Sequence, residues 1–129
     1  MKESQSIRLS VPAKAEYALV IRTALGGIGV IHNLDIDRMD DLLAAADECV
    51  DLLIHQTREG LAIDMTCLED EKGLKVHFEL MWGEKKREGR EVDAQMSQAV
   101  LSTLIACVNI ETDEYGVKGI TLLQSPCRF

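Results

Sequence analysis

The sequence has few aromatic residues, which make up 4% of its 129 positions. It therefore offers no evident stacking platform for single-stranded nucleic acid. Positive charge is also scarce, because 14 Lys and Arg residues stand against 22 Asp and Glu residues and give a net charge of −8. Direct binding to nucleic acid or to an anionic membrane requires a basic surface, so this composition argues against both. A basic protein partner is compatible with it.

Paired cysteines and long apolar runs are missing as well. The four cysteines, Cys49, Cys67, Cys107 and Cys127, form no CxxC pair, so no zinc site is predicted. The N-terminal end carries no apolar signal segment, and no run approaches the roughly 18 apolar residues that span a membrane. We therefore expect a cytoplasmic protein with reduced thiols. A length of 129 residues is typical of one domain, and we expect residues 1–129 to form it.

The strongest periodic pattern in the chain lies in residues 40–56. Apolar side chains recur there at helical spacing, and the run contains neither glycine nor proline. Asp35 or Asp37 is suited to cap the start of this helix, and Gly60 is predicted to end it.

A row of polar residues lies on one side of the same predicted helix. Asp47, Asp51 and His55 follow one another at intervals of four residues. Two carboxylates at this spacing repel each other by about 0.2–0.5 kcal/mol on an exposed helix. The row is either a solvated acidic face, with His55 near the negative end of the helix dipole, or a cation or general-base site. Spacing alone favours the solvated face.

The rest of the chain alternates between strand and helix patterns. The expected ranges are a strand at 6–11, a helix at 14–31, strands at 61–68 and 74–81, a helix at 93–108, and strands at 109–115 and 117–123. Asp93 is suited to cap the last helix. Helices grouped on one face of a mostly antiparallel sheet form a two-layer α+β sandwich, which is the predicted fold class.

Three other features are candidates for ligand binding. Residues 26–29 have the sequence GGIG, but they neither follow a strand nor open a helix, so close helix packing is the favoured interpretation. Residues 83–91 are predicted to form a mobile loop. This loop carries the basic cluster Lys85, Lys86, Arg87 and Arg90, which is suited to a phosphate or an acidic partner but is more simply explained as solvated. His77 is predicted to lie on a sheet face rather than to bind a metal.

Residues 11–30 resemble the opening of the anti-sigma factor serine kinases, which belong to the histidine-kinase-like ATPase superfamily. The resemblance rests on a strand that ends in VPA and on the pattern E-Y-x-x-x-x-R, with Glu16, Tyr17 and Arg22. Residues 47–55 are similar to the family motif E-A-x-x-N-A-x-x-H. The order of elements also fits, so the resemblance covers nearly the whole chain and implies a Bergerat-type ATPase fold with three helices on one face of the sheet.

The resemblance implies a role for each residue that matches a motif. Asp47 would be the general base that activates a serine hydroxyl or a water molecule. Asp51 would hold the magnesium ion that bridges the ATP phosphates, although the family has asparagine there; magnesium prefers such hard oxygen ligands. His55 closes the motif, and Gly83 matches a glycine of the second nucleotide motif, so both would contact the cofactor.

Two of the three nucleotide motifs of the family are changed in this chain. The second motif has no aspartate for the adenine amino group, since Leu80, Met81 and Trp82 precede Gly83. The third motif, a glycine-rich lid, is replaced by residues 93–99, and the segment before it is short. We therefore expect ATP and magnesium to bind weakly or not at all.

Three functions are compatible with this resemblance. The first is a regulator that holds a sigma factor or its antagonist through Glu16 and Arg22, commonly as a homodimer. The second is an active serine-protein kinase that uses Asp47 and Asp51. The third is a regulatory subunit whose partner supplies the nucleotide site. The changed motifs favour the first function and leave enzyme activity open.

Overall fold

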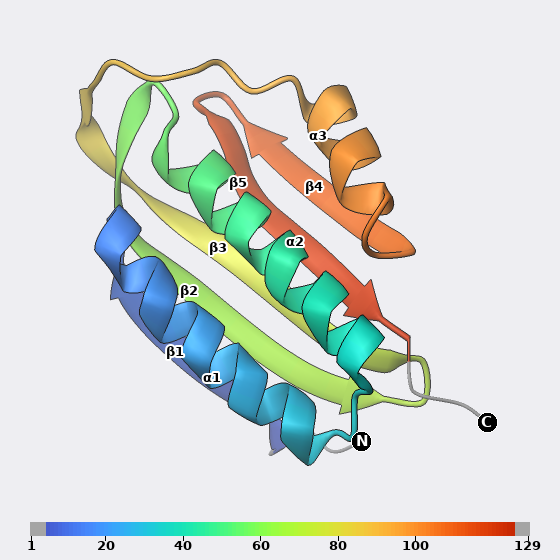
Figure 1. The fold of residues 1–129 in the computed structure, drawn as a ribbon. Coiled ribbons are helices and arrows are strands. Elements are labelled where there is room, and N and C mark those ends of the chain that lie inside the picture. The colour runs from blue at the N-terminus through green and yellow to red at the C-terminus, as the bar shows by residue number, and fades with distance from the viewer. Residues whose placement is uncertain (1–4, 126–129) are drawn as a thin grey trace.

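The computed structural model describes residues 5–125, and these form one antiparallel sheet with helices on one of its faces (Figure 1). The strands are β1 (Ile7–Pro12), β2 (Arg58–Asp70), β3 (Gly73–Lys86), β4 (Cys107–Asp113) and β5 (Gly116–Gln124). The helices are the short 3-10 turn η2 (Ala15–Tyr17), α1 (Ala18–Ile31), α2 (Ile36–Ile54) and α3 (Ala94–Ser102). The predicted two-layer α+β sandwich and its order of elements are therefore confirmed.

The sheet has the strand order β1-β2-β3-β5-β4, and each neighbouring pair is antiparallel. The two long strands β2 and β3 form a hairpin at its centre, as the alternating pattern of both segments predicts. Residues 5–125 contain no helix that combines the length and the apolar character needed to cross a bilayer.

The hydrophobic core lies between the helices and the sheet. On β3 the buried residues alternate as predicted, and Phe78 at the middle of the strand is completely buried. The apolar stripe of α2 packs onto this face of the sheet through Leu42, Ala45, Ala46, Cys49, Val50, Leu53 and Ile54. His77 lies on the opposite, open face, as predicted, where its ring contacts Thr121 and Glu79.

Helices α1 and α2 approach each other closely at their connected ends. A Cβ atom at Gly29 would clash with the side chain of Met39, so the glycine permits this contact. The predicted packing role of the glycine-rich segment is thus confirmed at one position. Asp35 caps α2, and its Oδ1 accepts a hydrogen bond from the backbone N–H of Arg38 at 2.8 Å.

The predicted end of α2 at Gly60 is wrong. The helix ends at Ile54, and Gly60 lies within β2, where it pairs with Trp82 of β3. The structural reason is Gln56, which is buried and donates through Nε2 to the carbonyl oxygens of Leu53 and of Val117 on β5. These bonds turn the chain out of the helix and into the sheet.

The predicted end of the last helix at Val108 is also wrong. Helix α3 ends at Ser102, because Thr103, Leu104 and Ile105 donate backbone hydrogen bonds to Val100 and Leu101 in a tight final turn. Cys107 therefore belongs to the edge strand β4 and is exposed, whereas the predicted helix at 93–108 includes it. Strand pairing of this segment with β5 accounts for the difference.

Candidate functional site

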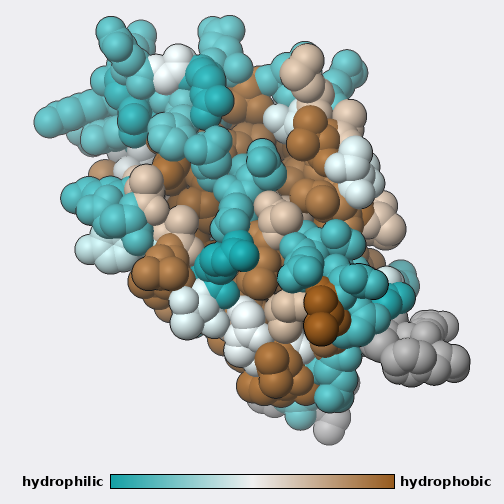
Figure 2. All heavy atoms as spheres, in the orientation of Figure 1, coloured by the Kyte–Doolittle hydropathy of each residue, from teal (hydrophilic) through white to brown (hydrophobic). Residues whose placement is uncertain are grey.

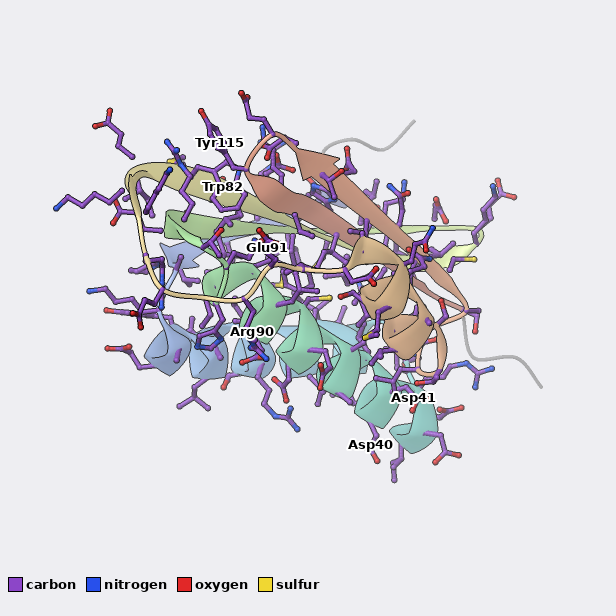
Figure 3. The ribbon with its side chains drawn as sticks, turned by 90° about the horizontal axis from the view of Figure 1, so that it is seen from above. Asp40, Asp41, Trp82, Arg90, Glu91 and Tyr115 are labelled. Carbon is purple, nitrogen blue, oxygen red and sulfur yellow. The ribbon has the colours of Figure 1, made fainter. Side chains whose placement is uncertain are left out.

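A cavity of about 310 Å³ opens between α2, α3 and the connection that joins β3 to α3. It is lined from α2 and the residue that follows it by Glu48, Asp51, Leu52 and His55, from the connection by Arg90, Glu91, Val92 and Asp93, and from α3 by Met96, Ser97, Val100 and Leu101. Figure 3 shows Arg90 and Glu91 on this connection, beside the C-terminal part of α2.

The polar centre of the cavity is formed by Asp51, His55 and Arg90. Nη2 of Arg90 donates to Oδ2 of Asp51 at 3.2 Å, and Nδ1 of His55 lies 3.0 Å from Oδ1 of the same carboxylate. Nδ1 of His55 also lies 2.9 Å from the backbone oxygen of Asp51. Both carboxylate oxygens of Asp51 therefore already have a partner within the chain.

The connection around Arg90 is attached to the C-terminal end of α2. The backbone N–H of Arg90 donates to the carbonyl oxygen of His55 at 2.8 Å, and that of Arg87 donates to Thr57 at 2.9 Å. Nη1 of Arg87 donates to the carbonyl of Ile54 at 3.0 Å, where a cation is favourable at the negative end of the helix dipole.

The prediction of a loop over residues 83–91 is therefore wrong in part. Residues 83–86 continue β3, because Arg58 of β2 pairs there with Lys86, and the segment that follows is hydrogen-bonded to α2. The four residues of the basic cluster also lie in two different environments. Arg87 and Arg90 contact α2, whereas Lys85 and Lys86 are exposed at the end of the hairpin.

The N-terminus of α3 faces the cavity but is capped by its own chain. Oδ1 of Asp93 accepts hydrogen bonds from the backbone N–H groups of Gln95 at 3.0 Å and Met96 at 3.2 Å, as the sequence predicts. These are the N–H groups that a helix N-terminus would otherwise present to an anion. An anion bound here would have to displace a carboxylate.

Comparisons of the sequence and of the fold with known proteins both point to RsbW proteins. No family model matches the sequence. Over 62 residues, or 47% of the chain, it is 30% identical to the serine-protein kinase RsbW of Bacillus mycoides, and this alignment spans 39% of that protein. The crystal structure of the RsbU and RsbW domains of Rv1364c from Mycobacterium tuberculosis superimposes with a TM-score of 0.74 at 15% identity; the match covers 96% of this chain and 33% of that one. The chain has the fold of an RsbW domain. The resemblance predicted from the sequence is thereby confirmed.

Of the residues that the resemblance assigns to the nucleotide, the RsbW-type fold brings only Asp51 and His55 to the cavity. Asp47 lies one turn earlier on α2 and pairs instead with Nη1 of Arg22 on α1. Gly83 lies on β3, where its carbonyl oxygen accepts a hydrogen bond from Nε of Arg58 at 2.6 Å, and it does not line the cavity.

The two residues assigned to partner binding lie at the other side of the helical layer. Glu16 is exposed in η2, and Arg22 is exposed on α1 with 46% of its side chain accessible. Because Arg22 pairs with Asp47, the surface that is expected to bind a partner adjoins the residue that is expected to act as the general base.

The sequence predicts a basic cluster that includes Arg90 and a helix cap at Asp93, but it does not place either residue beside Asp51. Arg90 belongs to a run of basic residues, and nothing in the local sequence indicates that the connection folds back onto Asp51. Asp93 is predicted as a helix cap, but its position beside a cavity depends on how α3 packs. Within residues 5–125, no group of three or more His, Cys, Asp or Glu side chains converges in a way that would hold a metal ion.

Proposed function

We propose that this chain is an RsbW-type regulator that acts by binding a protein partner, a sigma factor or its antagonist, through the outer face of α1. The observation that carries the proposal is the exposure of large apolar side chains at both ends of this helix and at the start of α2. Leu19, Val30 and Ile31 are each 69% exposed, and Ile36 at the start of α2 is 78% exposed. Figure 2 shows apolar side chains at the surface of this helical face. Large apolar side chains that are exposed on a helix beside charged residues are suited to contact with a partner protein.

The charged residues beside this surface are available to a partner. The pair between Arg22 and Asp47 is about half exposed on both sides, so it contributes little to stability and exchanges readily for a carboxylate on another protein. Glu16 lies one helical turn before Leu19 and is also exposed. In this way the α1 surface offers apolar contact together with charges of both signs, and the likeness to RsbW supports a sigma factor or its antagonist as the partner.

We further propose that the chain does not hold magnesium-ATP as its relatives are expected to. Two features support this. The N-terminus of α3 is capped by Asp93, and four carboxylates line the cavity. A triphosphate would meet these carboxylates in place of the backbone N–H groups and metal that such a ligand requires.

An active serine-protein kinase is the second candidate function. Its support is that Asp51 and His55 do line a cavity whose volume of about 310 Å³ is at the lower end of the range for small-molecule sites. If the site binds magnesium-ATP, a ligand concentration a hundred times Kd should raise the free energy of unfolding by about 2.7 kcal/mol. Thermal unfolding with and without magnesium-ATP separates the two candidates, and we expect no shift.

The partner proposal is tested by titrating the purified chain with the sigma factors and sigma-factor antagonists of its own organism. We expect one of them to bind, and the double change Leu19→Asp and Val30→Asp to weaken binding by about tenfold or more, because it places charge in a buried contact. Met81→Asp is the control for the single change Leu19→Asp, since Met81 is a 53% exposed apolar residue that lies on β3 and each change adds one negative charge. No association with any candidate, or equal losses for Leu19→Asp and Met81→Asp, would refute the proposal.

A homodimer is part of the same proposal, because the family commonly forms one. Light scattering during gel filtration measures the mass of the assembly directly. The expected value is twice the 14.3 kDa of one chain, and the mass of a single chain would contradict it.

A further inference from the structure

The cavity between α2 and α3 has an apolar wall and an acidic rim; we refer to it as the α2–α3 groove. Met96 and Val100 lie one turn apart on α3 and line it, and their side chains are 66% and 47% exposed. Large apolar side chains this exposed, side by side in a concave site, are favourable contact points for another apolar group.

The rim of the groove carries an excess of negative charge. Glu48 and Glu91 are exposed on facing walls, and within residues 5–125 neither has an ion-pair partner. Asp51 and Asp93 add two further carboxylates, against the single guanidinium of Arg90. A ligand for this groove must therefore be cationic where it meets the rim.

Arg90 shows how such a cation would bind. Its guanidinium reaches Asp51 at 3.2 Å while 70% of the side chain stays exposed. An ion pair this exposed is weak, so an arginine or lysine from another chain can replace it or join it at the same carboxylate. The aliphatic stems of such residues would also pack along Met96 and Val100.

We infer that the α2–α3 groove binds a basic amphipathic segment of a protein, in the place where relatives are expected to hold a nucleotide. Apolar side chains of the segment would contact Met96 and Val100, and its arginines or lysines would pair with Glu48, Asp51 and Glu91. This site is separate from the α1 surface, and the inference does not depend on the identity of the partner that binds there.

The experiment measures the fluorescence anisotropy of a labelled synthetic helical peptide with leucines on one face and arginines on the other. A second peptide carries glutamate in place of each arginine, and a third carries serine in place of each leucine. We expect the first peptide to bind and the other two to bind about tenfold more weakly or not at all, because each lacks one of the two contacts. Equal binding of all three would overturn the inference.

Two charge-reversed variants locate the site. Glu48→Lys with Glu91→Lys reverses the rim, and Asp40→Lys with Asp41→Lys makes the same charge change at the opposite end of α2 (Figure 3). We expect the rim variant to weaken binding by about tenfold and the control variant by less than about twofold. Equal effects of the two variants would mean attraction to net charge alone and would refute the site.

Two further double variants distinguish peptide binding in the α2–α3 groove from partner binding at the α1 surface. Met96→Ser with Val100→Ser removes apolar contacts from exposed positions and should weaken the leucine–arginine peptide without changing the net charge. Leu19→Asp with Val30→Asp alters the α1 surface and should leave peptide binding unchanged. If the α1 variant abolished peptide binding while the groove variants kept it, the peptide would bind at α1 and the groove inference would fail.

Discussion

The guanidinium of Arg22 on α1 pairs with the carboxylate of Asp47 on α2. The family resemblance assigns the first residue to partner binding and the second to general-base catalysis. An arginine orients the carboxylate that it binds, and here it directs Asp47 toward α1, away from the α2–α3 groove. A partner that engages Arg22 would therefore also release Asp47, so the two positions are physically coupled.

The strength of this coupling is open to direct measurement. Because both side chains are about half exposed, we expect Arg22→Ala and Asp47→Ala each to change the free energy of unfolding by less than about 1 kcal/mol. A double-mutant cycle by urea denaturation should give a coupling energy of about 0.2–1 kcal/mol. A coupling of zero would show that the pair does not persist in solution.

The second prediction concerns Gly89 in the connection that closes one side of the groove. A Cβ atom at this position would lie 2.6 Å from the carbonyl oxygen of His55 and would overlap the carbonyl oxygen of Gln56. Backbone atoms cannot move aside as the end of a side chain can, so we expect Gly89→Ala to destabilise the fold by about 1–3 kcal/mol. It should also speed hydrogen exchange at the Arg90 N–H, which donates to His55.

Gly27 provides the matched control for this change. It lies in α1, and a Cβ atom added there would have no neighbouring atom within 4 Å, so Gly27→Ala removes backbone freedom without a clash. We expect this variant to be more stable by up to about 1 kcal/mol in chemical denaturation. A Gly89→Ala protein as stable as the Gly27→Ala protein would contradict the close approach seen in the connection.

The third prediction concerns Gln56, whose buried side chain joins the end of α2 to β5. Its Nε2 donates to the carbonyl of Val117 at 2.8 Å, and its Oε1 accepts from the N–H of Val117 at 2.8 Å. Gln56→Leu leaves both backbone groups buried without a partner, at a cost of about 2–5 kcal/mol in the free energy of unfolding. Gln95→Leu, on the exposed face of α3, should change that free energy by less than about 0.5 kcal/mol.

The fourth prediction concerns the reactivity of the cysteines. Burial raises the pKa of the Cys67 thiol to about 11 and raises the pKa of Cys49 further still. Thiolate is the reactive form, so at neutral pH we expect a thiol reagent to modify the exposed Cys107 and to spare both buried thiols until the protein unfolds. Mass spectrometry of the labelled peptides distinguishes these sites, and rapid labelling of Cys49 in the folded protein would contradict the burial.

The same shift makes stability depend on alkaline pH. Because the folded state disfavours the Cys67 thiolate, the stability that this thiol contributes is complete below its ordinary pKa of 9.0 and falls as the pH rises toward about 11. We expect the difference in unfolding free energy between about pH 8 and about pH 10.5 to be smaller for Cys67→Val, which has no group to ionise. Equal pH dependence in the two proteins would argue against the shift.

Much of the fold was predictable from local patterns. The alternation of β2 and β3 and the apolar stripe of α2 report contacts with a single neighbouring layer, and the caps Asp35 and Asp93 are bonds within the first turn of their own helices. The ends of α2 and α3 were not predictable in the same way. The end of α2 depends on Gln56, which bonds to Val117 far along the chain, and the end of α3 depends on the pairing of the next segment with β5.

The candidate site was likewise predictable only in part from the sequence. The spacing of Asp51 and His55 placed them on one side of a helix, and the structure brings both to the groove. Whether that side faced a nucleotide site, a solvent-exposed row or a partner depended on groups from elsewhere in the chain. Arg90 arrives from the connection after β3, and Arg22 arrives from α1.

The layers, the order of the elements and the resemblance to the anti-sigma factor serine kinases followed from the residues alone, because periodicity and short motifs are local properties of the chain. The packing of the helices and of the connection after β3 was needed to show that Asp47 turns toward Arg22, that Asp51 is held by Arg90 and that the Asp93 cap lies beside the groove. The physical reason is that a charge is neutralised by whichever opposite charge the fold brings near it, and sequence distance does not limit that choice.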